Sequence, residues 1–182
     1  IAIGAVVSNI GTVKAVYDAV ALNKPLYERV VTVTGGAVNN PANFMVRIGT
    51  KVGDLLEQAG GIKDDAVKLV MGGPMMGFTF CDYDTPVIKG TSGILVLSSK
   101  EAKKSQRTAC LLCGRCLKAC PMSLQPTKMF KKIEAGKYAD ALNLNLMDCK
   151  ECGCCSFVCP AKRNLTQSIK SMRKTVLGKR KK

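Results

Sequence analysis

Eight of the ten cysteines form two sets with the same spacing, and this duplication constrains the fold more than any other feature of the sequence. The first set is Cys110, Cys113, Cys116 and Cys120; the second set is Cys149, Cys152, Cys155 and Cys159. The offset from each member of the first set to its counterpart is constant, and a proline follows the last cysteine of both sets. Both sets read C-x2-C-x2-C-x3-C-P, so two similar loops are expected around these thiols.

This spacing is the one that bacterial proteins use to bind [4Fe–4S] clusters. Three thiolates two residues apart on a tight turn can converge on three corners of one iron–sulfur cube, while the fourth points along the next helix toward the other cube. The sequence therefore predicts two clusters with exchanged fourth ligands. We expect one on Cys110, Cys113, Cys116 and Cys159, and the other on Cys149, Cys152, Cys155 and Cys120.

Zinc and disulfides are the alternative explanations for these cysteines. Structural zinc sites use two C-x2-C pairs separated by a longer loop, in which a third cysteine two residues on has no tetrahedral role. Disulfides are disfavoured because no hydrophobic signal segment is present and a reducing cytosol is therefore expected. Two cysteines lie outside the repeat. Cys154 is expected to be a bystander next to Cys155, and Cys81 a buried small apolar residue.

The composition excludes several classes of catalyst. Histidine is absent, which rules out Ser-His-Asp triads, Cys-His dyads and histidine-bound catalytic zinc, and we assign no catalytic residue. The longest apolar runs fall well short of the roughly 20 residues that cross a bilayer. Because the chain begins at Ile1 inside an apolar stretch, we expect it to be a piece of a longer protein.

The net charge of +15 resides in the second half of the chain. Residues 100–182 contain 20 Lys and Arg against 5 Asp and Glu, whereas residues 1–99 contain 8 of each kind. This half is expected to attract acidic redox proteins, with nucleic acid or anionic lipid as alternatives and a solvated surface as the simplest interpretation. The cations expected to surround the clusters are Lys103, Lys104, Arg107, Arg115, Lys118, Lys131, Lys132, Lys162 and Arg163, and the chain ends in Lys179-Arg180-Lys181-Lys182.

Residues 1–99 read as an α+β region. A helix is expected after Thr12, its N-cap, with an apolar stripe of Val13, Val16, Tyr17 and Val20, ending before Pro25. Strands are expected over 30–35, 44–48, 67–71 and 94–97, with a helix over 51–59 capped by Thr50. We divide this region into residues 1–29 and a domain of residues 30–99.

Residues 100–182 read as helical. The stripe Leu165, Ile169, Met172 and Val176 follows one helix face, for which core packing is favoured over a docking surface. Gly136 is expected to separate two earlier helices.

Several motifs resemble the C subunit of the Rnf complex, a membrane-bound, ion-translocating ferredoxin:NAD⁺ oxidoreductase. The strongest is the stretch from Cys149 to Arg163, C-K-E-C-G-C-C-S-F-V-C-P-A-K-R. The glycine loop 72–77, the segment 86–93 and the strand 29–35 resemble other parts of that protein. The resemblance implies residues 30–99 as a soluble-ligand-binding β-grasp domain and residues 100–182 as an all-helical, ferredoxin-like domain with two [4Fe–4S] clusters.

The resemblance also implies a cofactor and partners beyond this chain. Residues 6–12 resemble the last flavin-contacting segment of a complex-I-like domain, in which Asn9 and Thr12 match and Ser8 and Gly11 depart from the pattern. Residues 1–29 would be the end of that domain, with most of the FMN site and the NADH site upstream. The protein would be peripheral on the cytoplasmic side of the membrane, bound to other Rnf subunits and linked indirectly to ferredoxin. By itself the fragment would only carry electrons within a complex that moves Na⁺ or H⁺.

Two rival functions remain open at this point. One is a related flavin and iron–sulfur reductase, such as the cobalamin reductase of bacterial microcompartments. The other is a non-enzymatic iron–sulfur module that binds nucleic acid through the basic half. Few aromatic residues (Phe130, Tyr138 and Phe157) are available there for base stacking, so no nucleic-acid partner is expected.

Overall fold

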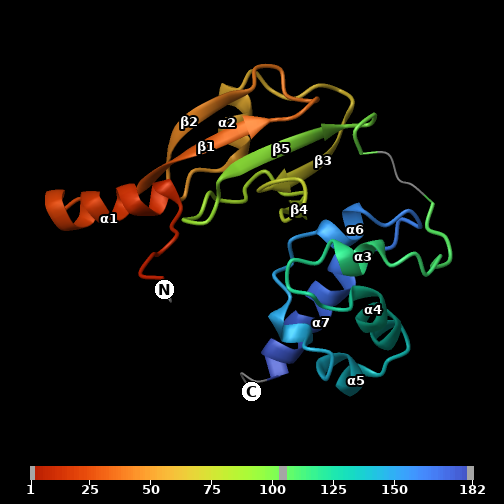
Figure 1. The fold of residues 1–182 in the computed structure, drawn as a ribbon. Helices are drawn as coiled ribbons and strands as arrows, with labels where there is room; N and C mark the ends of the chain where they lie inside the picture. Colours follow the sequence, from red (N-terminus) through yellow and green to blue (C-terminus); the bar gives the residue numbers. More distant parts are fainter. Residues whose placement is uncertain (1–2, 103–105, 180–182) are drawn as a thin grey trace. The chain divides into compact units, whose positions relative to one another are not determined.

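The computed structural model describes residues 3–102 and 106–179 (Figure 1). The chain divides into two units, one of residues 1–73 and 78–102 and the other of residues 74–77 and 103–182. Lys103, Lys104 and the last three basic residues lie outside the described residues. Among the residues that are described, no helix combines the length and the apolar character needed to cross a bilayer.

The first unit contains a mixed five-stranded sheet in the order β2-β1-β5-β3-β4. β1 pairs with β2 antiparallel and with β5 parallel, and β3 pairs antiparallel with both β5 and β4. The strands are β1 (Glu28–Thr34), β2 (Ala42–Arg47), β3 (Ala66–Met71), β4 (Phe78–Phe80) and β5 (Gly93–Ser98). A parallel neighbour for β1 requires a long crossover, which here contains β2, α2 (Val52–Gln58), β3 and β4.

The core of this unit lies between the sheet and the helix α2 (Val52–Gln58), which Figure 1 shows against the strands. The apolar side chains of α2 are buried together with alternate residues of the central strands, as the period of two in a strand requires. On β5, Ile94 and Val96 are fully buried while their neighbours are only half-buried. Burial of each such side chain stabilises the fold by about 1.5–3 kcal/mol.

The predicted strands and the helix α2 are present, with two differences. The prediction that Thr50 caps α2 is wrong, because the helix begins after Lys51. Lys51 makes no side-chain capping hydrogen bond. β4 was not predicted because three residues, Phe78–Phe80, are too few to show a period of two.

The helix α1 (Ile10–Leu22) begins after Asn9 and not after the predicted cap Thr12. The Oδ1 atom of Asn9 accepts a hydrogen bond of 2.9 Å from the N–H of Gly11, and Asn23, in the left-handed region at φ 52°, ends the helix before Pro25. Every residue of the helix is at least partly exposed, so its apolar stripe lies on no core of the described chain.

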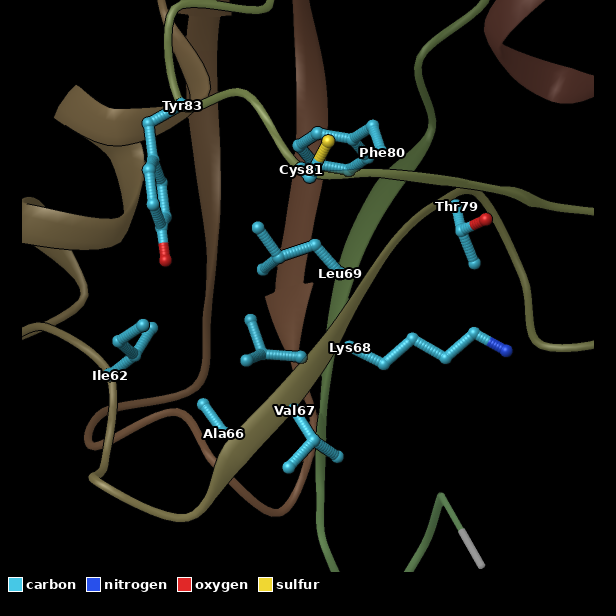
Figure 2. A pocket seen from close by; sticks show the side chains of 10 residues that line it. Ile62, Ala66, Val67, Lys68, Leu69, Thr79, Phe80, Cys81 and Tyr83 are labelled. Carbon is cyan, nitrogen blue, oxygen red and sulfur yellow. The ribbon is translucent and has the colours of Figure 1, made fainter. Parts of the chain in front are cut away.

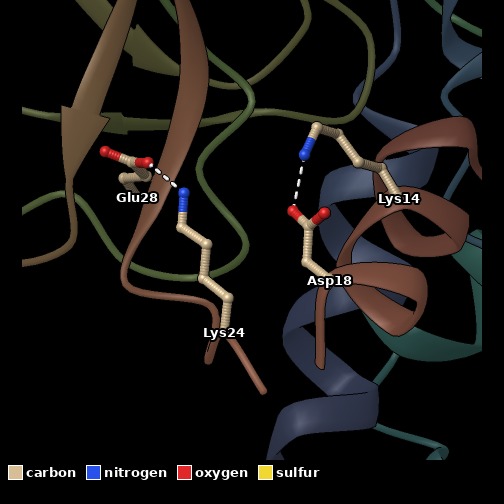
Figure 3. Close-up of polar contacts among 4 residues, drawn as sticks. All are labelled: Lys14, Asp18, Lys24 and Glu28. Carbon is tan, nitrogen blue, oxygen red and sulfur yellow. Dashed lines mark hydrogen bonds and ion pairs between the residues drawn. The ribbon is translucent and has the colours of Figure 1, made fainter. Parts of the chain in front are cut away.

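Two ion pairs stabilise α1 and the segment that follows it (Figure 3). Lys14 pairs with Asp18 four residues on, and Lys24 pairs in the same way with Glu28 at 2.9 Å. Exposed pairs of this kind contribute little to stability, because solvent screens the two charges. They do not substitute for core packing.

The second unit is built from short helices and one longer C-terminal helix. These are α3 (Arg115–Lys118), α4 (Pro126–Glu134), α5 (Tyr138–Leu142), the 3-10 helix η1 (Leu146–Asp148), α6 (Cys154–Phe157) and α7 (Leu165–Lys179). Gly136, at φ +69°, separates α4 from α5 as predicted. The stripe on α7 is confirmed as core packing, because Ile169 and Met172 are buried against Met129 of α4 and Val176 is half-buried on the same cluster.

Candidate metal centre

Four thiols line one cavity of the second unit, and three of them come from the first cysteine set. Cys110, Cys113, Cys116 and Cys159 surround a space of about 580 Å³. The cations Arg115, Lys128, Lys131 and Arg163 line the same cavity. Arg163 is held in place by a 2.7 Å ion pair with Glu134 and by stacking 4.6 Å from the centre of the Phe130 ring.

The other four thiols line a second, much narrower cavity of about 20 Å³. These thiols are Cys120, Cys149, Cys152 and Cys155. The remaining lining is mostly apolar and includes Met122, Leu124, Met129 and Ile169. The last cysteine of each set therefore lines the cavity of the other set, and the exchanged ligation of iron stays a prediction.

The duplication is visible in the backbone as well as in the sequence. Three positions of each repeat have positive φ: Leu112, Gly114 and Ser123 in the first, and Glu151, Gly153 and Lys162 in the second, each pair at the same offset as the cysteines. Left-handed backbone costs roughly 1–2 kcal/mol at a residue with a Cβ atom. Glycine at the turn before α3 and before α6 avoids that cost, and each helix then starts directly after it.

Hydrogen bonds reach the cysteine sulfurs from both the backbone and side chains. The N–H groups of Leu124 and Glu151 donate to the sulfurs of Cys120 and Cys149, each at 3.4 Å. The sulfurs of the third cysteines lie close to threonine hydroxyls: Cys116 to Thr127 at 2.7 Å, and Cys155 to Thr166 at 3.3 Å. Sequence reasoning missed these threonines, although they obey the same offset as the cysteines.

Burial raises the pKa of two thiols that line the second cavity, Cys149 and Cys155. It raises the pKa of Cys149, against a smaller opposing effect of the hydrogen bond from Glu151. Burial likewise raises the pKa of Cys155, with the Thr166 hydroxyl acting in the opposite direction. A metal centre must displace the protons of such thiols, so binding releases protons.

The donor set fits an iron–sulfur cluster at each cavity. Among the described residues, no three side chains of the usual ligand types converge closely enough to hold a single metal ion. Four thiols instead surround each space, and thiolates are the ligands that iron–sulfur clusters use. The second space is narrow, so its thiols would have to spread apart to admit a cube.

The two cysteines outside the repeat have different outcomes. The prediction that Cys81 is buried is wrong: its thiol is exposed at the end of β4, where it lines a shallow cavity of about 490 Å³ with Phe80 and Tyr83 (Figure 2). A three-residue edge strand offers too little cover to bury it. Cys154 is half-buried and lines neither thiol cavity; a hydrogen bond with Cys152 raises its pKa.

The residues expected near flavin, Asn9 and Thr12, are both exposed, at the start of α1. The structure gives Asn9 a local role as helix cap, and the N–H of Thr12 bonds to the carbonyl of Asn9 at 2.9 Å. They lie in the first unit, and the eight repeated cysteines all lie in the second.

Comparison with known families defines the class of the chain. The SLBB domain family matches residues 30–79, within the sheet region, and the 4Fe-4S dicluster domain family matches residues 109–162, which include all eight repeated cysteines. The chain is thus an α+β protein that joins an SLBB domain to an iron–sulfur dicluster domain.

Its particular relatives are the C subunits of ion-translocating oxidoreductase complexes, as the sequence motifs indicated, and the chain is homologous to part of them. It is 44% identical over 172 residues to the C subunit of the proton-translocating ferredoxin:NAD(+) oxidoreductase complex of Clostridium ljungdahlii, covering 94% of this chain and 38% of the relative. It is 40% identical over 179 residues to the Na(+)-translocating counterpart of Acetobacterium woodii, covering 98% and 40%. The corresponding C subunit of Rhodobacter capsulatus is 43% identical over 145 residues, covering 80% and 28%. The chain therefore spans about two fifths or less of the length of these relatives.

Proposed function

We propose that this chain carries electrons through two [4Fe–4S] clusters. The observation that supports this most directly is the lining of the two cavities: each has three thiols from one cysteine set and the last thiol from the other. The first cluster would be held by Cys110, Cys113, Cys116 and Cys159. The second would be held by Cys149, Cys152, Cys155 and Cys120.

A bound cluster supplies one-electron transfer without bond chemistry on a substrate. The residues of the chain then have three tasks: the thiolates hold the iron, the apolar side chains around the second cavity exclude water, and the cations around the first offset negative charge. Arg163, anchored by Glu134 and Phe130, holds a positive charge beside the first site.

The electron path belongs to a larger assembly in this proposal. Because the relatives are named as subunits of ferredoxin:NAD(+) oxidoreductase complexes, the chain would act in such a complex, coupled to Na⁺ or H⁺ movement. It would contact other Rnf subunits at the cytoplasmic face of the membrane and reach ferredoxin indirectly. FMN and NADH would bind mostly outside this chain.

The domain assignment extends the proposal. Residues 30–99 would be a β-grasp domain, which the mixed sheet with one helix packed on it supports. Residues 100–182 would be the helical ferredoxin-like domain. Residues 1–29 would end a flavin domain with Asn9 and Thr12 near the cofactor, which agrees with the exposure of the apolar stripe on α1.

Anaerobic purification of the chain tests the proposal. We expect about eight iron atoms per polypeptide, visible absorbance that dithionite bleaches, and EPR signals from reduced clusters. The Cys81→Ser and Cys154→Ser variants are matched controls and should retain the full iron content, because neither thiol lines a thiol cavity. Stoichiometric zinc, or absorbance that dithionite does not change, would contradict the proposal.

A further inference from the structure

The third cysteine of each repeat has the same hydroxyl neighbour. Thr127 lies in the first turn of α4 and Thr166 in the first turn of α7, each eleven residues after the cysteine whose sulfur it contacts. Cys116 and Cys155 are the most buried of the eight repeated thiols, each with 8% of its surface exposed. The two contacts are thus duplicated together with the cysteine loops.

The direction of these hydrogen bonds follows from the protonation state of the ligand. Between a thiol and a hydroxyl either group can donate. A cysteine that ligates iron is a thiolate and has no proton. The hydroxyl must then be the donor, and the sulfur gains a hydrogen bond to its negative charge.

The second repeat prepares its hydroxyl for this role with a further bond. Ser156 Oγ donates to Thr166 Oγ1 at 3.0 Å and accepts from the N–H of Thr166 at 2.9 Å. Since the Thr166 oxygen already accepts one proton, its own proton is available to Cys155, and hydrogen bonds in such a chain strengthen one another. The first repeat has Leu117 in place of Ser156, so its shorter contact has no such relay.

Another threonine of the same helix shows the ordinary alternative. The hydroxyl of Thr175 donates to the carbonyl of Ser171 at 3.2 Å, four residues earlier. Helical threonines often bond to their own backbone in this way. Thr127 and Thr166 instead direct their hydroxyls at sulfur.

We propose that Thr127 and Thr166 are positioning residues that raise the reduction potential, each of its own cluster only. The inference depends on the proposed function, because it requires both clusters to be present. Reduction adds one negative charge, which is shared with the sulfur ligands, and a hydroxyl donor stabilises the reduced state more than the oxidised state. Removing the donor therefore lowers the potential.

The test is a redox titration of the full chain, monitored by EPR, for Thr127→Val and Thr166→Val. Valine keeps the shape of threonine and removes the donor. We expect each variant to lower the reduction potential of one of the two clusters. At a fixed applied potential, the ratio of reduced to oxidised cluster at that site should fall several-fold. The two variants should shift the potentials of different clusters.

Three controls separate the hydroxyl from its surroundings. Thr127→Ser and Thr166→Ser retain the donor, so both reduction potentials should equal those of the wild-type chain. Ser156→Ala should shift the same potential as Thr166→Val, in the same direction but by less. Thr175→Val makes the same change on α7 away from the thiols and should shift neither potential.

The outcomes distinguish this inference from the proposed function. Wild-type chain without iron clusters would overturn the proposed function itself. Valine variants that bind both clusters and leave both reduction potentials unchanged would overturn only the role of the threonines. A valine variant that shifts both potentials equally would have the same consequence. If the valine variants lose the cluster and the serine variants keep it, the hydroxyl serves cluster assembly, which overturns its proposed role in setting the potential.

Discussion

The two cysteine repeats of the second unit have matching backbones but different surroundings. Both contain left-handed residues at three corresponding positions, including Leu112 in the first and Glu151 in the second, each at φ 54°. Yet the first cavity is wide and has four cations among its mostly apolar lining, whereas the second is narrow and has one, Lys150. The ligand spacing fixes the shape of the loop, and the residues between the ligands determine its environment.

The spacer at one position illustrates this difference. Leu112 is 74% exposed. Its counterpart Glu151 forms an ion pair with Arg173 and lies 3.7 Å from Lys170, both on α7. One loop therefore presents an apolar side chain to solvent, whereas the other is fastened to the longest helix of its unit.

The largest effect is expected from the exchanged fourth ligand. Cys120→Ser should remove the cluster of the second cavity, although Cys120 belongs to the first set, and should leave about four iron atoms per chain. Cys159→Ser should do the reverse, because Cys159 lines the first cavity. Iron analysis and EPR of the reduced variants measure both results.

The pair of variants provides its own control, since each should spare the cluster that the other removes. Loss of the cluster of the variant's own set, or equal damage to both signals, would contradict the exchange and with it the correspondence between the repeats.

The difference in thiol exposure predicts a difference in resistance to oxidation and chelation. The first site should lose iron several-fold faster than the second when the loaded chain is exposed to air and a chelator. The reason is that Cys113 at the first site is exposed, whereas the thiols of the second site are half-buried or buried. EPR of samples re-reduced at intervals follows each signal, and loss at equal rates would show that burial in the second repeat protects nothing.

The sequence predicted the parts of the fold that depend on local pattern. The β-branched strands, the stripe on α7 and the break at Gly136 are each visible in a short window of residues. The short strand β4 and the cap at Asn9 were missed, because three residues show no period and two competing cap residues stood near each other. The exposure of Cys81 depends on its place at the sheet edge, which no local pattern encodes.

The sequence predicted which thiols of the candidate site lie together but not the environment around them. Spacing alone indicated which thiols share a cavity, because the geometry of a short turn determines where they point. The hydroxyls of Thr127 and Thr166 and the ion pair of Glu151 with Arg173 depend on how α4 and α7 pack beside the loops. The constant offset between the repeats could have identified the threonines if it had been followed beyond the prolines.

A smaller effect is expected from the ion pair that fastens the second loop. Glu151→Gln should destabilise the second unit by about 1 kcal/mol, the upper end for ion pairs that solvent still reaches. The change leaves two cations, Arg173 and Lys170, without a carboxylate while their side chains are only 20% and 30% exposed. Urea unfolding under anaerobic conditions, followed by circular dichroism, measures the loss. Leu112→Gln is the matched control in the first loop and should cost little; an equal loss from both would mean that the ion pair adds no stability.

The smallest effect is expected from single cations at corresponding positions. Lys131 and Lys170 match each other in the two repeats, but Lys131 is exposed at the first cavity whereas Lys170 faces Glu151. Lys131→Gln should lower the potential of the first cluster by less than the roughly 59 mV that corresponds to a tenfold change in a one-electron equilibrium. Added salt should reduce the shift, because it screens exposed charges. Lys170→Gln should shift the potential of the second cluster less still, because Glu151 already offsets the charge of Lys170. A larger shift from Lys170→Gln than from Lys131→Gln would contradict the assignment of the more cationic environment to the first site.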